Sequence, residues 1–341
     1  MTLRRPFSLG SLELPSNIFC APLAGCSDLP FRQMTSRFRP GLIFCEMIKI
    51  EALIHNNSKT SRFLDYTPDM RPIGAQICGS KPQIAATAAK IVEDLGFDVI
   101  DLNCGCPVDK VVKDGSGSGL LKTPELIGEI VSAIVSAVRI PVTIKIRSGW
   151  NDLEINAVSV TTIAEQAGAA AITVHGRTRA QGYKGSADWE IIGECKRAAK
   201  TIRVIGNGDV VDGESAARMF EKTGCDGVLV ARGTLGQPWI IEDIERHLSG
   251  LPPIQRTLED LRSTLIDHFQ KITQYQPERQ AVLDMRRVGC WYLKRCIGAK
   301  ALRMQINQAA SLDEVFLLLD RFDWSSLSLH QKPQFAEIDG S

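Results

Sequence analysis

Short apolar segments rich in β-branched residues recur along the first two thirds of the chain. Most are continuously apolar rather than alternating, a pattern typical of strands that are covered on both faces in a parallel sheet. We therefore predict eight parallel strands, each followed by a loop. The strands fall in residues 18–25, 42–48, 72–79, 99–105, 142–147, 171–177, 203–209 and 227–233.

Helical patterns fill most of the gaps between these segments. Pro82 and Pro124 suit the first turns of two helices, Thr123 is placed to cap the second, and Gly96 lies past the end of the first. A strand–loop–helix unit repeated eight times in about 230 residues predicts an α/β fold, a closed (β/α)8 TIM barrel, in preference to an open doubly wound sheet. The clearest helical patterns cover residues 81–96, 123–138, 154–168 and 212–224.

The pattern changes after a break rich in Gly and Pro at residues 249–255. Three further helical patterns follow and no strand pattern accompanies them, so we predict a small all-helical domain after the barrel. The expected organisation is a barrel at 1–248, a helical domain at 255–330 and a tail without readable structure at 331–341. The three helical patterns cover residues 257–275, 278–296 and 311–323.

Composition and charge narrow the class of protein. The chain has 341 residues, 44% of them hydrophobic, and a net charge of +1, so the chain as a whole carries no nucleic-acid signal. No apolar run reaches the roughly 18 residues that a membrane helix needs. The N-terminal segment lacks the apolar core of a secretion signal, and the ten cysteines are scattered, as is typical of free thiols. We therefore expect a cytoplasmic protein without disulfides.

Polar residues gather where the predicted strands end. Because barrel enzymes carry their chemistry at the carboxyl ends of the strands, these residues are candidates for a functional site. The alternative is that strand ends are polar only because they are wet. The strand ends carry Ala24, which is apolar, and the polar residues Gln76, Asn103, Lys145, His175, Asn207 and Arg232.

The last two strands lead into glycine-rich turns, at 205–210 and 230–239. Loops in these positions bind phosphate in many barrels, and Arg232 can add donors. A phosphate-bearing cofactor over the barrel mouth would meet Gln76, Lys145 and His175, and flavin mononucleotide (FMN) fits those groups. Lys145 could instead form a structural ion pair, and His175 could be a satisfied rim histidine. No Gly-x-Gly-x-x-Gly fingerprint supports a Rossmann site.

Cys104 and Cys106 lie at the end of the fourth strand, separated by one glycine. Metal binding is disfavoured because no further ligands accompany them, and one intervening residue is poor geometry for a disulfide. Cys104 reads as buried packing. Cys106 lies beyond the strand at the mouth, where a thiol is a candidate acid or nucleophile.

One segment of the helical domain is strongly basic. Between residues 279 and 303 seven basic residues stand against one acidic residue, and Trp291 and Tyr292 lie among them. This is a reasonable footprint for a phosphate backbone, although a solvated helix face would look similar. The candidates for contact are Arg286, Arg287, Lys294 and Arg295.

Several motifs together resemble the tRNA-dihydrouridine synthase family, and most closely its bacterial B-type. They are "APLAG" (21–25), "NCGCP" (103–107), "KIR" (145–147), "VHGRTRAQGYKGSADW" (174–189), "GNGD" (206–209) and "ARGTLGQPW" (231–239). The likeness spans about residues 15–245 and is weaker in the helical domain. There, "MRRVGCWY" has Val288 where B-type relatives often carry His, and Val288 offers no polar group for an RNA contact.

The resemblance implies an FMN barrel followed by a tRNA-binding helical domain. It implies reduction of selected uridines in tRNA by NADPH or NADH, with hydride delivered to C6 and a proton from Cys106 to C5. Asn103 would hold the uracil edge, and Arg177 and Arg179 would contact substrate or phosphate. We also expect a monomer with no metal and no membrane association. The matching flavin positions are Pro22, Leu23, Ala24, Gln76, Lys145, His175, Asn207, Gly208, Asp209, Ala231 and Arg232.

Two other functions remain open at this point. A flavin barrel could reduce a free pyrimidine, although a small substrate does not need a basic helical domain. An inactive barrel could bind RNA as a chaperone, although Cys106, Lys145 and His175 are intact.

Overall fold

The computed structural model describes residues 3–55 and 61–330, so the predicted tail at 331–341 lies outside the described residues. Eight parallel strands form a closed ring, because the last strand pairs with the first, and the predicted TIM barrel is confirmed. In ring order the strands are β3 (Ile18–Cys20), β4 (Leu42–Phe44), β6 (Ile73–Cys78), β7 (Val99–Cys104), β8 (Val142–Arg147), β9 (Ala171–His175), β10 (Arg203–Asn207) and β11 (Gly227–Val230). A short extension of two residues, β5 (Ile48–Lys49), pairs with the end of β6.

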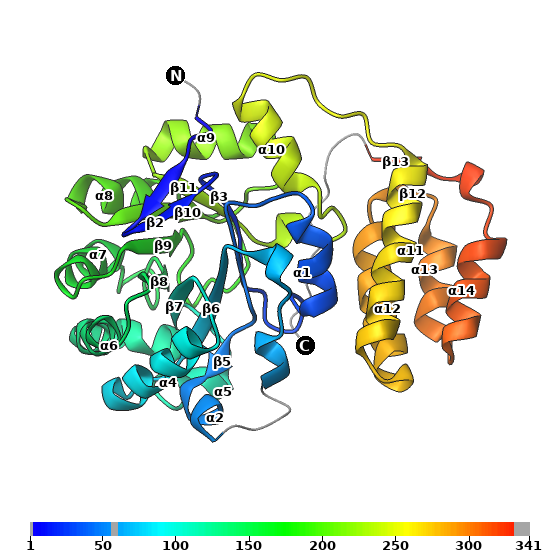
Figure 1. The fold of residues 1–341 in the computed structure, drawn as a ribbon. Coiled ribbons are helices and arrows are strands. Elements are labelled where there is room, and N and C mark those ends of the chain that lie inside the picture. The colour runs from blue at the N-terminus through cyan, green and yellow to red at the C-terminus, as the bar shows by residue number, and fades with distance from the viewer. Residues whose placement is uncertain (1–2, 56–60, 331–341) are drawn as a thin grey trace.

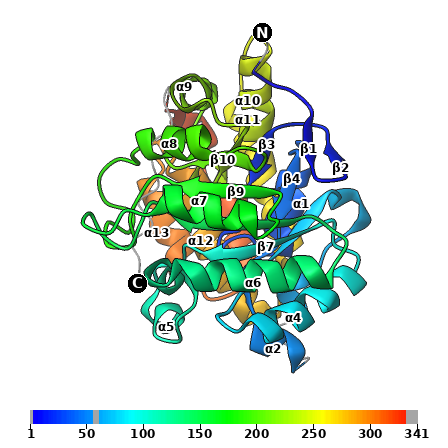
Figure 2. The same cartoon turned by 90° about the vertical axis from the view of Figure 1, so that its left-hand side faces the viewer.

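The strand bodies are buried on both faces, as their continuous apolar runs predicted. All six residues of β6 and all six of β7 are buried. The helices cover the outside of the barrel, which Figure 2 shows for α6, α7 and α8. They are α1 (Leu29–Ser36), α2 (Ile50–Ile54), α4 (Pro82–Asp94), α5 (Asp109–Val112), α6 (Pro124–Ala137), α7 (Ala157–Gln166), α8 (Glu190–Ala198), α9 (Gly213–Thr223) and α10 (Ile240–Leu248).

The helix boundaries follow the predicted signals with one difference. Thr123 occupies the N-cap position of α6, but its side chain makes no capping hydrogen bond. The inner face of α6 carries Ile127, Ile130, Val131 and Ile134, whose spacing places all four toward the barrel. A hairpin that the sequence did not predict, β1 (Phe7–Leu9) and β2 (Leu12–Leu14), precedes the first barrel strand.

The described part of the helical region contains four helices rather than the three predicted. They are α11 (Leu258–Tyr275), α12 (Glu278–Leu293), α13 (Lys300–Gln308) and α14 (Leu312–Arg321), and the sequence analysis missed α13. A two-stranded ribbon, β12 (Cys296–Ile297) and β13 (Ser328–Leu329), ties the region together. None of the helices in the described ranges is long and apolar enough to cross a membrane.

The helical region is packed firmly against one side of the barrel rim. Figure 1 shows it in yellow to red beside α1. Phe31 of α1 meets Trp291 of α12 edge to face, with ring centroids 6.3 Å apart. Leu235 and Trp239, which follow β11, belong to the same apolar cluster as the helical core. The Tyr275 hydroxyl donates to Asp65 at 2.8 Å. The side of the mouth formed by the first and last barrel strands therefore adjoins the helical region.

Gly236 lies at the closest point of this contact. Its φ of 70° is in the left-handed region, and a Cβ added there would lie 2.3 Å from the Trp291 carbonyl oxygen. Gly224, which ends α9, has a similar φ of 66° but open space around it. Comparing substitutions at the two glycines therefore distinguishes the cost of a positive φ, which both share, from the cost of a steric clash, which only Gly236 would have.

We predict that Gly236→Ala destabilises the protein more than Gly224→Ala. Both substitutions place a side chain at positive φ, which costs about 1–2 kcal/mol. Gly236→Ala adds a clash against the α12 backbone, which typically costs about 1–3 kcal/mol more. Urea denaturation of the two variants measures the difference in the free energy of unfolding. Equal losses in the two variants would show that the contact at Gly236 is not tight.

Candidate active site

A cavity of about 650 Å³ opens at the carboxyl ends of the barrel strands. Its volume lies within the usual range for small-molecule sites. It brings together the eleven residues that the resemblance assigned to flavin binding, namely Pro22, Leu23, Ala24, Gln76, Lys145, His175, Asn207, Gly208, Asp209, Ala231 and Arg232. Asn103, Cys106 and Arg177 also line it, whereas Arg179 lies outside. Arg179 pairs with Asp109 at 2.8 Å and stacks over Trp150.

One end of the cavity is built from the glycine-rich turns after β10 and β11. Gly208 has a φ of 117°, and a Cβ there would lie 2.7 Å from the Ala187 Cβ. A Cβ on Gly233 would lie 2.6 Å from the Val210 carbonyl oxygen. Bare backbone is therefore required at both turns, and it leaves main-chain groups open to the cavity. Arg232 lies at the same end, with its guanidinium 4.9 Å from the Tyr183 ring centroid.

Asp209 is the acidic group of this end, and the protein's own arginines occupy it. Arg177, which is almost fully buried, reaches both Asp209 carboxylate oxygens at 2.8 and 2.9 Å. Arg232 lies 3.7 Å from the same carboxylate. The Ala187 N–H donates to it at 2.7 Å. Because its charge is matched twice over, this end of the cavity is electropositive overall, as a phosphate site requires.

Lys145 and His175 lie on the neighbouring strands β8 and β9, and His175 is beside the Gly208 turn, because a Cβ on Gly208 would lie 3.1 Å from a carbon of its ring. Burial lowers the pKa of Lys145 to about 8, and the nearby Arg147 adds to the decrease. Burial together with Lys145 and nearby arginines holds the pKa of His175 well below its usual value, so its ring is neutral at physiological pH. The His175 Nε2 lies 3.4 Å from an Arg177 nitrogen, which can only donate. Nε2 is therefore the acceptor, and the hydrogen lies on Nδ1.

The two cysteines of the β7 end have different environments. Cys104 is the last residue of the strand and is fully buried, and burial raises the pKa of its thiol well above the usual value. Cys106 is partly exposed and lines the cavity. Its carbonyl accepts the N–H of Ser118 at 3.0 Å and the Ser118 hydroxyl at 2.9 Å. All ten cysteines are free thiols.

Asn103 organises the turn that carries Cys106. Its side-chain oxygen accepts the backbone N–H groups of Gly105 at 3.1 Å and Cys106 at 2.9 Å. Its amide nitrogen donates to Gln76 at 2.8 Å. Through the region that the structure describes, no group of three or more His, Cys, Asp or Glu side chains is arranged to hold a metal ion.

The sequence analysis did not single out two residues that line the cavity, Arg147 and Tyr183. The Arg147 Nε donates to the Gly105 carbonyl at 2.9 Å, and one terminal nitrogen donates to Thr178 and Gly182, so it ties the cysteine turn to the loop after β9. Arg147 follows Lys145 by two positions on one strand, and that spacing could have indicated a shared face. Tyr183 lies in an irregular loop, and no periodic signal indicated it.

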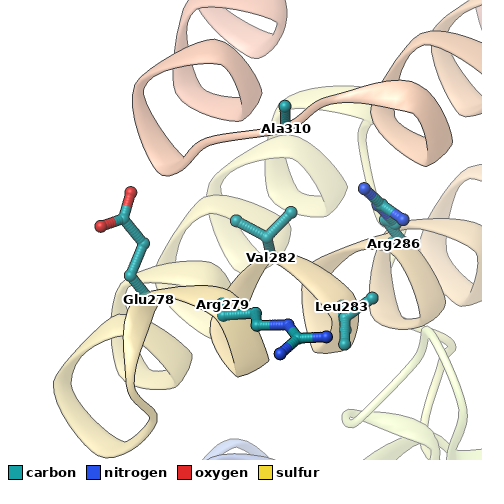
Figure 3. Close-up of a pocket in the computed structure, with 6 residues that line it drawn as sticks. All are labelled: Glu278, Arg279, Val282, Leu283, Arg286 and Ala310. Carbon is teal, nitrogen blue, oxygen red and sulfur yellow. The ribbon is translucent and has the colours of Figure 1, made fainter.

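The basic residues of the helical region face different surroundings. Arg287 pairs with the buried Asp284 at 3.0 Å. Burial raises the pKa of Cys26, which lines the cavity, and the charge of Arg287 opposes that increase. Arg286 donates to the Ala309 carbonyl at 2.8 Å and lines a separate surface pocket with Arg279, as Figure 3 shows. Burial lowers the pKa of Arg295, which lies near Asp243 of α10. Lys294 is partly buried and occupies the C-cap position after α12.

Comparisons with known proteins agree with this geometry. The family model described as "Dihydrouridine synthase (Dus)" matches residues 19–325. The chain is 40% identical over 301 residues to a "Probable tRNA-dihydrouridine synthase" of Rickettsia bellii, covering 88% of this chain and 92% of that protein. It is 38% identical over 306 residues to "tRNA-dihydrouridine synthase B" of Pseudomonas aeruginosa, covering 89% and 92% of the two chains.

Solved structures show the same barrel at low sequence identity. Histamine dehydrogenase from Rhizobium sp. 4-9 matches with a TM-score of 0.57 and 15% identity, over 79% of this chain and 51% of that one. The structure titled "TcOYE with pHBA" matches with a TM-score of 0.54 and 14% identity, over 76% and 96%. These likenesses concern the fold alone. The family model and the close relatives together show that the chain belongs to the dihydrouridine synthase family.

Proposed function

We propose that this protein reduces uridines in tRNA to 5,6-dihydrouridine, in the cytoplasm, with FMN as its bound cofactor and NADPH or NADH as reductant. The observation that carries the proposal is the single cavity that unites the flavin-type positions with Asn103 and Cys106. The names of the relatives support tRNA as the substrate, since both are called tRNA-dihydrouridine synthases. We further propose that the protein acts as a monomer.

The residues present fit FMN. The bare turns at Gly208 and Gly233, together with Arg232, suit a phosphate group. Gln76 and Lys145 at the opposite end suit the polar edge of an isoalloxazine ring. When bound and reduced, FMN supplies the hydride that adds to C6 of the uracil ring.

Cys106 is the proposed acid. Hydride addition at C6 leaves the electron pair of the former double bond on C5 and the adjoining carbonyl, and one proton at C5 completes the reduction. A cysteine thiol at the mouth can give that proton as a general acid. The Cys106 side chain lines the cavity, whereas Cys104 is sealed in the barrel core. Lys145 lines the same cavity and would place a cation beside the flavin ring, which becomes anionic when it is reduced.

The hydrogen bonds inside the protein revise the proposed role of Arg177. Its five N–H groups point to Asp209, His175 and the carbonyls of Lys184 and Gly185. No donor remains for a substrate, so we propose that Arg177 supports the site rather than touching the uracil. Arg147 is different, because its Nη2 has no hydrogen-bond partner among the described residues and remains available to a ligand.

The target base must leave its stack to reach the cavity, which is less costly in a tRNA loop than in a helix. Arg287 is a residue of α12 that lies toward the mouth. Burial raises the pKa values of Cys26, Asp28 and Glu46 at the rim, and the nearby positive charge of Arg287 opposes each increase. We propose that Arg287 holds an RNA phosphate beside the mouth. Arg286, Lys294 and Arg295 are proposed to contribute more weakly, because each is partly buried.

A test of the function uses purified protein loaded with FMN, NADPH and tRNA from cells that lack this protein. We predict that Cys106→Ala slows dihydrouridine formation about a hundredfold or more, as loss of a general acid does. Cys104→Ala is the matched control, and it should cost about 1 kcal/mol of stability with little change in rate. Dihydrouridine is measured by mass spectrometry of digested tRNA.

The opposite ranking of the two cysteine variants would refute the assignment of the acid. If the parent protein formed no dihydrouridine but reduced a free pyrimidine, the small-molecule function would replace the one proposed here. If it bound tRNA yet reduced neither substrate with FMN present, the RNA-binding alternative would stand.

We predict that Arg287→Gln weakens tRNA binding and lowers the slope of log Kd against log salt by about 1, because one phosphate contact is lost. Glutamine can still donate to the buried Asp284, which protects the fold. Arg286→Gln should change the slope less. Filter binding at several salt concentrations gives both slopes, and flavin absorbance shows that the cavity is intact. Equal slope changes would instead support comparable phosphate contacts by both arginines, which the sequence analysis listed together as candidates.

A further inference from the structure

A chain of buried hydrogen bonds runs from the barrel interior to the turn that carries Cys106. The Thr143 hydroxyl donates to one oxygen of Asp101 at 2.6 Å, and the Gln76 amide donates to the other at 2.7 Å. Asn103 donates to Gln76 at 2.8 Å, and it accepts the N–H groups of Gly105 and Cys106. Asp101, Gln76 and Asn103 are all buried.

The two ends of this chain allow one orientation of both amides. A backbone N–H can only donate, so the Asn103 oxygen must face the turn and its nitrogen must face Gln76. An ionised carboxylate can only accept, so the Gln76 nitrogen must face Asp101 and its oxygen must face Asn103. The acceptor at one end and the donors at the other therefore agree.

The same accounting determines what Asn103 can show to a ligand. Both lone pairs of its oxygen are used by the turn, and one hydrogen of its nitrogen is used by Gln76. One N–H remains, and Asn103 lines the cavity. Asn103 can therefore donate to a carbonyl oxygen, but it cannot accept from a ring N–H.

We propose that Asp101 is a positioning residue that fixes the amides of Gln76 and Asn103, so that the Cys106 turn is held in place and Asn103 presents only a hydrogen-bond donor to the uracil. The part that concerns the turn stands on the hydrogen bonds alone. The part that concerns the uracil rests on the proposed function.

The environment of Asp101 is consistent with an ionised carboxylate. Burial raises its pKa to about 6, while the donors from Thr143 and Gln76 and the charge of Lys145 oppose the increase. Lys145 is next to Asn103 across the β7–β8 pairing. At pH 8 the carboxylate is charged and can only accept.

We call the hydrogen-bond chain from Asp101 through Gln76 to Asn103 the relay. Exchanging the carboxylate at position 101 and the amide at position 103 tests it. Asn103→Asp alone places Gln76 between two carboxylates, and one of its contacts must become repulsive. Asp101→Asn combined with Asn103→Asp restores every bond with the amide of Gln76 reversed. The new carboxylate at position 103 accepts from the turn and from Gln76, while the new amide at position 101 donates to Gln76. The combination therefore repairs the turn, but it removes the donor that position 103 shows to the cavity.

The turn is followed by the rate at which iodoacetamide alkylates Cys106 at pH 8, measured by peptide mass spectrometry. We expect Asn103→Asp to change this rate about tenfold or more, and the double variant to return within about threefold of the parent protein. Cys104 is an internal reference, since it reacts only if the barrel opens. Dihydrouridine formation should stay at least about tenfold below the parent in the double variant.

A control variant removes a buried carboxylate elsewhere. Asp226 is buried, accepts the Val204 N–H at 2.9 Å, and immediately precedes β11 at the amino ends of the strands. Asp226→Asn should lower the melting temperature and leave the Cys106 rate unchanged. If it changed the Cys106 rate as much as Asn103→Asp does, the effect would be one of general stability and the relay would be refuted.

Additive effects of the two exchanges on the Cys106 rate would overturn the positioning role. Full recovery of dihydrouridine formation in the double variant would overturn the donor role of Asn103. If Asn103→Asp does not fold, the same test is made at the next residue of the relay, by comparing Gln76→Glu with Gln76→Glu combined with Asp101→Asn. The double variant is again expected to restore the alkylation rate of Cys106. A parent protein that forms no dihydrouridine would refute the proposed function, while the alkylation rates would still decide the relay.

Discussion

Closure of the parallel barrel is the constraint on which the site depends. Because β11 pairs with β3, the carboxyl ends of all eight strands face one mouth. Residues as distant in the chain as Leu23 and Arg232 thereby line one cavity. The strand bodies are too fully buried to hold unpaired polar groups, so charged side chains collect at the rim, where backbone turns and other charges can satisfy them.

The charges at the mouth are arranged so that positive potential remains. Asp209 is matched by Arg177 and Arg232, and Asp101 lies below the rim, where Thr143 and Gln76 hold it. Burial, and after it the surrounding cations, lower the pKa of His175 and keep its ring neutral. A site of this kind favours a phosphate at one end and an electron-rich ring at the other, which is the distribution of charge in a reduced flavin nucleotide.

The sequence predicted the fold well because strand bodies and covering helices have strong, repeated patterns. The helix α13, Lys300–Gln308, was missed because most of its residues are exposed and only Leu302 and Ile306 are buried. The hairpin at β1 and β2 was missed because strands of three residues carry too little alternation. Tertiary context, which the local sequence does not contain, decided both.

Most members of the site were predictable, but Arg179 lies outside the cavity and Arg147 and Tyr183 were not singled out. Residues at strand ends could be listed from their positions, yet the partners of each side chain depend on distant loops. Arg286 and Arg287 are neighbours in sequence, but they lie about 100° apart around α12. Arg287 therefore faces the rim, and Arg286 faces the connection between α13 and α14. Cys104 and Cys106 differ in burial only because β7 ends between them.

Hydrogen bonds within the protein also explain why residues of the same type in one motif differ in the donors and acceptors that they leave for a ligand. Arg177 and Arg147 both line the cavity, but the first has no donor left, whereas the second retains Nη2. Gln76 and Asn103 are both amides, but the turn consumes the acceptor of Asn103. Selectivity at such a mouth follows from the few donors and protons that the protein's own network leaves unused, because a buried group that is already paired loses a bond when it turns to a ligand.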